Sequence, residues 1–372
     1  MIMIPKGIRE CKCLLATTNM GPCIVRNMFR FFSTSRQGGP DIAIDLGTAN
    51  TRVILRSGGI VFEEPTASCF SNKGGRELFV SAGSDAFAMV DRVSGGLHIR
   101  RPLARGVVQD LGAASAYMQY VLKAVMGRLR LGRPNVMVGI PADATKAEAS
   151  ALRTVLSDAG FGRVSLVKET YAAAVGAGLD ISAARASMII ECGAGTTEIA
   201  VFSIDGECLI RSVRGGGQSL DEALIEYMRA KHHFLIGLRT AERLKHAVSR
   251  KISLLEVDTS GICADSADRM VEIKGRDLRT GLPAIRLLPA SEFQPVFKKH
   301  LVPIVETTRG VLATIKPDLA ADLLSGSIIA TGGCASISLL SEMITNDTGL
   351  PIEAVNDEAL CVSRGLETLM AG

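Results

Sequence analysis

Apolar residues along the chain follow two spacings, one typical of buried strands and one typical of amphipathic helices. A continuous apolar run at 136–140 predicts a strand covered on both faces of a sheet. Apolar residues recur at helical spacing over 111–128 and 219–232. Such strands and helices alternate along much of the sequence, which predicts an α/β fold.

The most distinctive stretch is 41–55, in which two apolar strands flank a polar turn. Asp45 ends the first strand, and Gly47 lets the backbone approach a ligand closely. Successive backbone N–H groups in such a turn form an anion site. Because a carboxylate would repel a phosphate, the acid predicts an intervening divalent cation, with water-bridged Mg²⁺ as the best fit. For this motif alone, a plain β-hairpin is the alternative. The predicted phosphate-binding residues are Gly47, Thr48, Ala49 and Asn50.

A second turn repeats this design within residues 188–202. Glu191 ends an apolar strand, Gly193 follows two residues later, and threonines lead into another apolar strand. About 146 residues separate Asp45 from Glu191, which is roughly the length of one domain. The repeat predicts a duplicated fold, with one phosphate clamp in each half and the ligand between them. The residues of the second clamp are Gly193, Ala194, Gly195 and Thr196.

Further motifs predict elements around these turns. Thr240 is a predicted helix N-cap. Residues 265–273 and 284–288 predict strands, with a turn at Gly275 between them. Residues 327–334 predict a strand that runs into a glycine turn and a helix, a second place where backbone could pass close to a nucleotide.

Nine segments carry a resemblance to a known family: IDLGTANT (44–51), GIVFEEP (59–65), RPLARGVVQD (101–110), VGIPADAT (138–145), LVKETYAAAVGAGL (166–179), IIECGAGTTEIAV (189–201), LDEALIEYMR (220–229), TAERLKHAVS (240–249) and ATGGCASI (330–337). In this order they resemble the MreB family of bacterial cell-shape proteins, within the actin-like ATPase superfamily. The resemblance covers nearly everything from about 40 to 370. It implies duplicated actin/ribonuclease H-like domains with the nucleotide in the cleft between them. Residues 41–182 would form the first half, and 183–372 the second half with a nucleoside-binding subdomain.

The resemblance also implies roles for individual residues. Glu169 matches the glutamate that orients the water attacking the γ-phosphate of ATP, a role that needs a positioned proton acceptor. Asp45 and Glu191 would bracket the Mg²⁺. The alternative for Glu169 is a surface acid at a helix start, which the helix dipole favours. The implied nucleoside contacts are Glu242, Lys245 and Ser249 on one helix face, with Gly332, Gly333, Cys334 and Ala335 in the later glycine turn.

For the helix face, an ordinary ion pair between Glu242 and Lys245 is the alternative. The chain also departs from the family pattern at several positions. Glu191 stands where these proteins usually have aspartate, and Ala194 and Cys334 replace glycines. Lys168, Thr170 and Gln218 are further departures. These changes are typical of a diverged paralogue in which ATP binding survives and the hydrolysis rate is the property most affected.

Composition fits this interpretation. The chain has 372 residues, enough for two domains. A net charge of +4, from 42 Lys and Arg against 38 Asp and Glu, is too mild to indicate nucleic-acid binding. The nine cysteines lack metal-type spacing, which favours reduced thiols in a cytosol. No stretch approaches 18 apolar residues, so no transmembrane helix is predicted. By the resemblance, the protein would be cytoplasmic and peripheral to the inner membrane.

Residues 1–40 form an N-terminal extension unlike the rest, with six basic residues and one acid. An apolar-basic segment at 28–35 is predicted to bind membrane through Met28, Phe29, Phe31 and Phe32. In the family the loop at 126–134 also helps to touch the membrane, which implies a role for Leu129 and Leu131; a solvated turn is the alternative. Residues 1–27 would be an upstream extension, so the true start codon is Met1 or Met28. A targeting peptide is the less favoured explanation.

The sequence therefore predicts an ATP-binding, actin-like cytoskeletal protein that polymerises with itself into membrane-associated filaments. By the resemblance, these filaments organise cell-wall synthesis and cell shape together with cell-wall elongation proteins. A weak ATPase activity, with ATP and Mg²⁺, would be coupled to polymerisation. A small-molecule kinase of the same superfamily fold is the alternative. A chaperone ATPase is less favoured, because no substrate-binding domain follows the second half.

Overall fold

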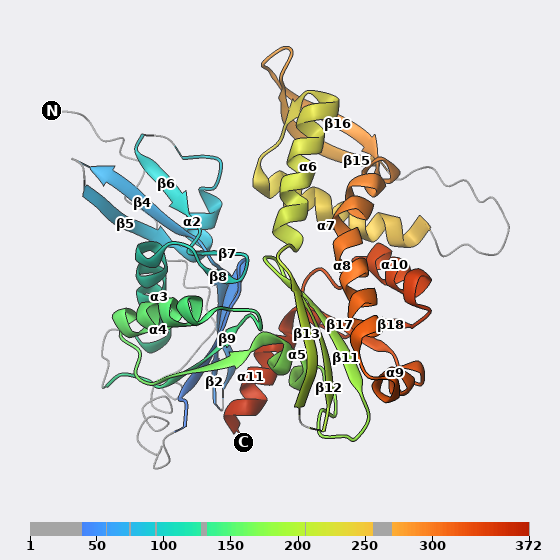
Figure 1. Cartoon of the computed structure of the whole chain (residues 1–372). Coiled ribbons are helices and arrows are strands. Elements are labelled where there is room, and N and C mark those ends of the chain that lie inside the picture. Colours follow the sequence, from blue (N-terminus) through green and yellow to red (C-terminus); the bar gives the residue numbers. More distant parts are fainter. Residues whose placement is uncertain are drawn as a thin grey trace. The chain divides into compact units, whose positions relative to one another are not determined.

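The computed structural model describes residues 39–371, except 57, 74–75, 94, 128–131, 205 and 256–269 (Figure 1). The chain divides into two compact units, Met1–Gly39 and Pro40–Gly372, and almost all described residues belong to the second. The predicted membrane residues Met28, Phe29, Phe31, Phe32, Leu129 and Leu131 lie outside the described residues, so their role stays a prediction. Within the described part, no helix is long and apolar enough to cross a membrane.

The first large sheet has the order β10-β9-β1-β2-β3. Its strands are β1 (Ile42–Leu46), β2 (Asn50–Leu55), β3 (Gly59–Pro65), β9 (Val136–Ile140) and β10 (Val164–Lys168). β1 and β2 form an antiparallel hairpin, whereas β9 runs parallel to both β1 and β10. Every residue of β1 and β9 is buried, which confirms the strand predicted from the continuous apolar run at 136–140. Helices α3 (Leu111–Met126) and α4 (Lys146–Ala159) supply apolar residues to the same core.

The second large sheet repeats this topology with the order β13-β12-β11-β17-β18. Its strands are β11 (Ser187–Cys192), β12 (Thr197–Ser203), β13 (Gly206–Val213), β17 (Ile328–Thr331) and β18 (Ile352–Ala354). Again a central antiparallel hairpin, β11–β12, is extended by a third antiparallel strand on one side and by two parallel strands on the other. The strand-for-strand correspondence confirms the predicted duplication.

Two helices that pack on each other join the sheets into one structure. Helix α5 (Glu169–Gly176) packs on α11 (Cys361–Ala371), and Figure 1 shows the pair between the two large sheets. The approach is close, since a Cβ added at Gly365 would lie 1.7 Å from the Ala172 carbonyl oxygen. One buried cluster accordingly contains Ala43 and Ile54 from the first sheet, Ala172–Ala174 from α5, Ile189 and Phe202 from the second sheet, and Val362 and Leu366 from α11.

Smaller elements extend both halves. The first half carries β4 (Ser68–Lys73), β5 (Arg76–Ala82), α2 (Gly83–Ala88), β6 (Leu97–Arg100), β7 (Leu103–Ala104) and β8 (Val107–Val108). The second carries α6 (Gly217–His232), β14 (Phe234–Leu235), α7 (Leu238–Leu255), β15 (Met270–Asp277), β16 (Pro283–Pro289), η1 (Ala290–Phe293), α8 (Gln294–Thr314), α9 (Pro317–Leu324), α10 (Ser338–Thr348) and η2 (Glu358–Leu360). Strands β5-β4-β6 and β14-β15-β16 form two separate small sheets.

Two local predictions were wrong. Gly275 is not a turn residue: it lies inside β15, opposite Ala284, where a Cβ would come within 2.4 Å of the Leu235 carbonyl oxygen. The glycine therefore serves close strand packing, and the turn lies further on, where Gly281 has a φ of +73°. Thr240 is not an N-cap, because α7 already begins at Leu238.

Candidate functional site

The two duplicated turns and the later glycine turn line one cavity of about 140 Å³. The structure thus brings together thirteen of the predicted residues: Asp45, Gly47, Thr48, Ala49, Asn50, Glu169, Glu191, Gly193, Ala194, Gly195, Thr196, Gly332 and Gly333. Arg52, Gly106, Glu358, Ala359 and Val362, which the sequence analysis did not single out, complete the lining. The cavity lies between the β1–β2 hairpin of one half and the β11–β12 hairpin of the other.

The two turns approach each other closely. A Cβ added at Gly195 would lie 2.3 Å from Thr48 Oγ1 and 2.8 Å from the Gly106 backbone nitrogen. That nitrogen donates a hydrogen bond to Thr48 Oγ1 at 3.0 Å. Position 195 therefore accepts no side chain unless the two turns move apart, and the glycine sets how narrow the cavity is.

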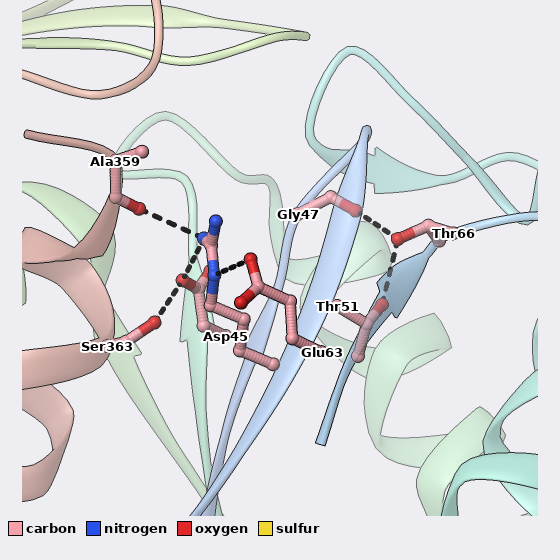
Figure 2. A network of polar contacts seen from close by, with 8 residues as sticks. Asp45, Gly47, Thr51, Glu63, Thr66, Ala359 and Ser363 are labelled. Carbon is pink, nitrogen blue, oxygen red and sulfur yellow. Dashed lines mark hydrogen bonds and ion pairs between the residues drawn. The ribbon is translucent and has the colours of Figure 1, made fainter. Parts of the chain in front are cut away.

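The β1–β2 turn is held by a network of polar contacts, which Figure 2 shows. Ser363 on α11 donates to Asp45 Oδ2 at 2.7 Å, and Arg52 Nη1 donates to the same oxygen at 3.4 Å. Burial raises the pKa of Asp45, while the Ser363 hydrogen bond and the Arg52 charge act in the opposite direction. Thr66 Oγ1 donates to the Gly47 carbonyl oxygen at 2.7 Å, which fixes the turn itself.

Three further carboxyl groups, those of Glu169, Glu191 and Glu198, form an acidic cluster around the cavity. Burial raises the pKa of Glu191 well above its usual range, and the nearby charges of Glu198 and Asp45 raise it further. Glu169 is half-buried, and burial is the main cause that raises its pKa well above the usual range. Repulsion from the Glu191 charge is the second cause. Carboxyl groups that are desolvated and that repel one another are stabilised in their charged form by a cation.

This donor set fits the expected Mg²⁺. Within the described residues no group of three or more His, Cys, Asp or Glu side chains is placed to hold a metal. An ion here would take few protein ligands and keep several waters, which is the usual behaviour of Mg²⁺ beside phosphates. Asp45 and Glu191, one from each hairpin, are the carboxylates that line the cavity at the ends of β1 and β11.

Glu198 is an acid that the sequence analysis missed. It lies directly opposite Glu191 in the β11–β12 pair and is fully buried. Its Oε1 accepts hydrogen bonds from the Ala142 backbone nitrogen at 2.7 Å and from Ser212 Oγ at 2.9 Å. Burial raises its pKa to about 7. The hairpin register could have revealed it, because it pairs Glu191 with Glu198 across the turn.

A second, smaller cavity of about 90 Å³ adjoins the first, since Ala49, Asn50 and Ala194 line both. Of the predicted nucleoside contacts, Glu242 and Lys245 line this second cavity. Lys245 Nζ donates to Asp221 Oδ2 at 2.9 Å and to the Gly217 carbonyl oxygen at 3.0 Å. The lysine is therefore paired with α6, and the ion pair with Glu242 that was the alternative is not formed.

Three predicted nucleotide contacts, Ser249, Cys334 and Ala335, do not line either cavity. Ser249 Oγ donates back to the Lys245 carbonyl oxygen at 2.8 Å within α7. The Cys334 backbone nitrogen donates to the Cys192 carbonyl oxygen at 3.0 Å, and Ala335 is buried. The polar groups named here already bond to other parts of the chain, and a nucleotide contact by these three residues stays a prediction.

Comparison with known proteins decides the family. The family model described as MreB/Mbl protein matches residues 39–372. The chain belongs to the MreB/Mbl family. The cell shape-determining protein MreB of Escherichia coli strain K12 is 35% identical over 328 residues, covering 87% of this chain and 91% of that protein. The family assignment confirms the resemblance seen in the sequence.

Similar solved structures agree with this family assignment. The crystal structure of MreB5 of Spiroplasma citri bound to ADP matches with a TM-score of 0.79 at 27% identity, covering 89% of this chain and 96% of that one. The structure of the same protein bound to AMPPNP matches with a TM-score of 0.78 at 28% identity, covering 90% and 96%. The fold of this MreB/Mbl protein is therefore the actin-like α/β fold that the family resemblance implies.

Proposed function

We propose that the cavity between the two hairpins binds ATP with Mg²⁺. The observation that carries the proposal is that two equivalent glycine-containing turns, one from each half, line a single cavity with an acid at each strand end. Backbone N–H groups of the two turns would hold phosphates, and Asp45 with Glu191 would hold the cation through water. The ADP and AMPPNP bound to MreB5 of Spiroplasma citri support this assignment.

The second cavity suits the nucleoside. Glu242 and Lys245 would contact the sugar and base edge there, next to the shared residues Ala49, Asn50 and Ala194. The turn at Gly332 and Gly333 would also pass close to the nucleotide, because both glycines line the first cavity.

We propose a weak ATPase in which Glu169 positions the attacking water. A bound Mg²⁺ would neutralise phosphate charge as it develops. The pKa of Glu169 is raised first by burial and then by repulsion from the neighbouring carboxylates, above all Glu191. A bound cation would offset this repulsion, and the Glu169 carboxylate could then accept the proton of the water. Glu169 begins α5 and lines the cavity, which suits this role better than that of a surface acid.

We also propose that nucleotide binding drives assembly into filaments on the inner membrane surface, where they organise cell-wall synthesis with elongation proteins. Membership of a family of cell shape-determining proteins supports this proposal. The protein would then reside in the cytoplasm, peripheral to the inner membrane. The apolar-basic segment at 28–35 and the loop at 126–134 are the proposed membrane contacts.

Calorimetric titration of the purified chain tests the nucleotide proposal. ATP with Mg²⁺ should bind at one site per chain, and EDTA should weaken binding by at least tenfold because the phosphates would then face uncompensated carboxylates. Absence of heat with either ATP or ADP at millimolar concentration would remove the nucleotide from the cavity.

A further inference from the structure

Arg52 places a positive charge in the acidic cavity, and neither the duplicated motif nor the proposed function uses it. The residue lies on β2 directly opposite Asp45 in the hairpin register and lines the same cavity as the two turns. Only 12% of its side chain is exposed. A charge that is desolvated to this degree needs partners, and its partners show what it can do.

The contacts of Arg52 are unequal. Its Nε donates to Glu63 Oε1 at 2.9 Å, and its Nη1 donates to the Ala359 carbonyl oxygen at 2.9 Å. The contact from Nη1 to Asp45 Oδ2 is longer, at 3.4 Å. Figure 2 labels the three residues whose oxygens accept these hydrogen bonds, Asp45, Glu63 and Ala359. Two firm contacts therefore anchor the group, and the third is at the edge of hydrogen-bonding distance.

Asp45 in turn does not depend on Arg52 for its position. Ser363 donates to the same carboxylate oxygen at 2.7 Å, from helix α11, which packs on α5 and on the first large sheet. The carboxylate could thus exchange the guanidinium for a cation and stay in place. The guanidinium could release Asp45 and stay at the cavity wall through Glu63 and Ala359.

We propose that Arg52 is the counter-ion of Asp45 in the empty cavity and a phosphate ligand in the loaded one. The proposal rests on the nucleotide function proposed above. A cation at Asp45 releases the guanidinium, whose five N–H donors suit a phosphate oxygen. The same positive charge then has opposite effects on the two components, since it repels a free divalent cation and attracts a free phosphate. Metal and nucleotide consequently bind better together than either does alone.

Two binding measurements on Arg52→Met test these opposite effects of Arg52 on cation affinity and on nucleotide affinity. Mn²⁺ alone, titrated by calorimetry, should bind the variant several-fold more tightly than the wild type, because the competing charge is gone. ADP in EDTA should bind the variant about tenfold more weakly, because a phosphate contact is lost. Arg52→Lys keeps the charge and should stay close to the wild type in the Mn²⁺ titration.

Arg56→Met is the matched control. Arg56 is exposed and follows Arg52 by four residues in the sequence. Its guanidinium group donates to the Pro40 carbonyl oxygen, and it does not line the cavity. Both of its affinities should equal those of the wild type. If Arg52→Met weakened or left unchanged both Mn²⁺ and ADP binding, the proposal would be overturned. If Arg52→Met does not fold, as judged by its thermal melt, Arg52→Gln is titrated in its place with the same expected signs.

The outcomes also separate this inference from the proposed function. A wild type that binds no ADP under any condition contradicts the nucleotide site itself. The Mn²⁺ titration then still reports on Arg52, because competition between the guanidinium and a cation for Asp45 needs no nucleotide. A wild type that binds ADP, together with an Arg52→Met variant whose Mn²⁺ affinity is unchanged, contradicts only the role of Arg52.

Discussion

The carboxyl group of Glu198 is fully buried on β12, and its Oε2 has no hydrogen-bond partner among the residues that the structure describes. Its pKa of about 7 lies above the ordinary value of 4.5 because burial disfavours the charge. The protonated group therefore favours the folded state, so its contribution is complete below pH 4.5 and is lost as the pH rises to about 7.

Glu198→Gln should remove this pH dependence. The nucleotide-free wild type should lose stability between about pH 4.5 and 7, by at most roughly 3 kcal/mol from this group. The amide keeps an acceptor for the Ala142 nitrogen but cannot ionise, so the melting temperature of the variant should fall less steeply over the same range. Thermal melts at half-unit pH steps measure both slopes. Parallel curves for variant and wild type would contradict the assigned titration.

Glu169 provides the residue-scale test of catalysis. Glu169→Gln keeps the shape of the side chain but removes the proton acceptor, so ATP hydrolysis should fall on the order of 10²-fold with ATP affinity nearly unchanged. Phosphate release and calorimetry measure the two quantities. Glu353→Gln, on an exposed residue of β18, is the control and should leave both unchanged. Equal hydrolysis by Glu169→Gln and wild type would exclude Glu169 from the site.

Single-residue signals predicted much of the candidate site, since thirteen motif residues line the cavity. These sequence signals failed for residues whose role depends on the residue that faces them on a neighbouring strand. Arg52 and Glu198 look like ordinary charges in a strand until the hairpin registers pair them with Asp45 and Glu191. Ser363 is 318 residues away from Asp45 in sequence, so nothing local connects the two.

At the scale of elements, the two hairpins are expected to act as a pair. Gly195→Ala should force them apart, because the new Cβ would meet Thr48 Oγ1 at 2.3 Å and the backbone nitrogen of Gly106 at 2.8 Å. A shift of tenths of an ångström misplaces the N–H donors of both turns, and ATP affinity should fall about tenfold or more.

Gly310→Ala is the matched control for this change. Nothing lies within 4 Å of a Cβ at Gly310, in helix α8, so the variant should bind ATP as the wild type does. Calorimetric titration of both variants, with melts to verify folding, gives the comparison. Wild-type affinity in Gly195→Ala would mean that the spacing between the turns does not limit binding.

Element prediction succeeded where hydrophobic periodicity is strong and failed where tertiary contacts decide. The buried strands β1, β9 and β11 follow directly from apolar runs. Strand β5 was not predicted, because five of its seven residues are exposed and its pairing with β4 gives no apolar alternation. Gly275 was taken for a turn residue because local sequence does not reveal that another strand packs against it.

At the scale of the whole molecule, the shared core around α5 and α11 links both sheets to the cavity, because Glu169 and Ser363 belong to these helices. Changes in the cavity can therefore be transmitted to both halves through rigid packing. This arrangement suits a protein whose assembly would respond to its nucleotide.

Membrane attachment is also predicted at this scale. Phenylalanines in the segment 28–35 can contribute a few kcal/mol at about 25 cal/mol per Å², and each arginine about 1 kcal/mol near anionic lipid. One segment binds weakly, whereas a filament repeats it, so polymer rather than monomer should sediment with anionic liposomes. Deleting 28–35 should abolish this co-sedimentation without loss of ATP binding, and deleting 1–27 should change little. Full liposome binding by the 28–35 deletion would assign attachment to the loop at 126–134 or to a partner.

Nucleotide-dependent assembly is the central claim, and negative-stain electron microscopy tests it most directly. The purified chain should form filaments when ATP and Mg²⁺ are added and should remain unassembled in EDTA, since the proposed assembly depends on bound nucleotide and the nucleotide would bind with the cation. A chain that binds ATP to saturation yet forms no filaments, and transfers phosphate to a small acceptor instead, would contradict the account and indicate a kinase.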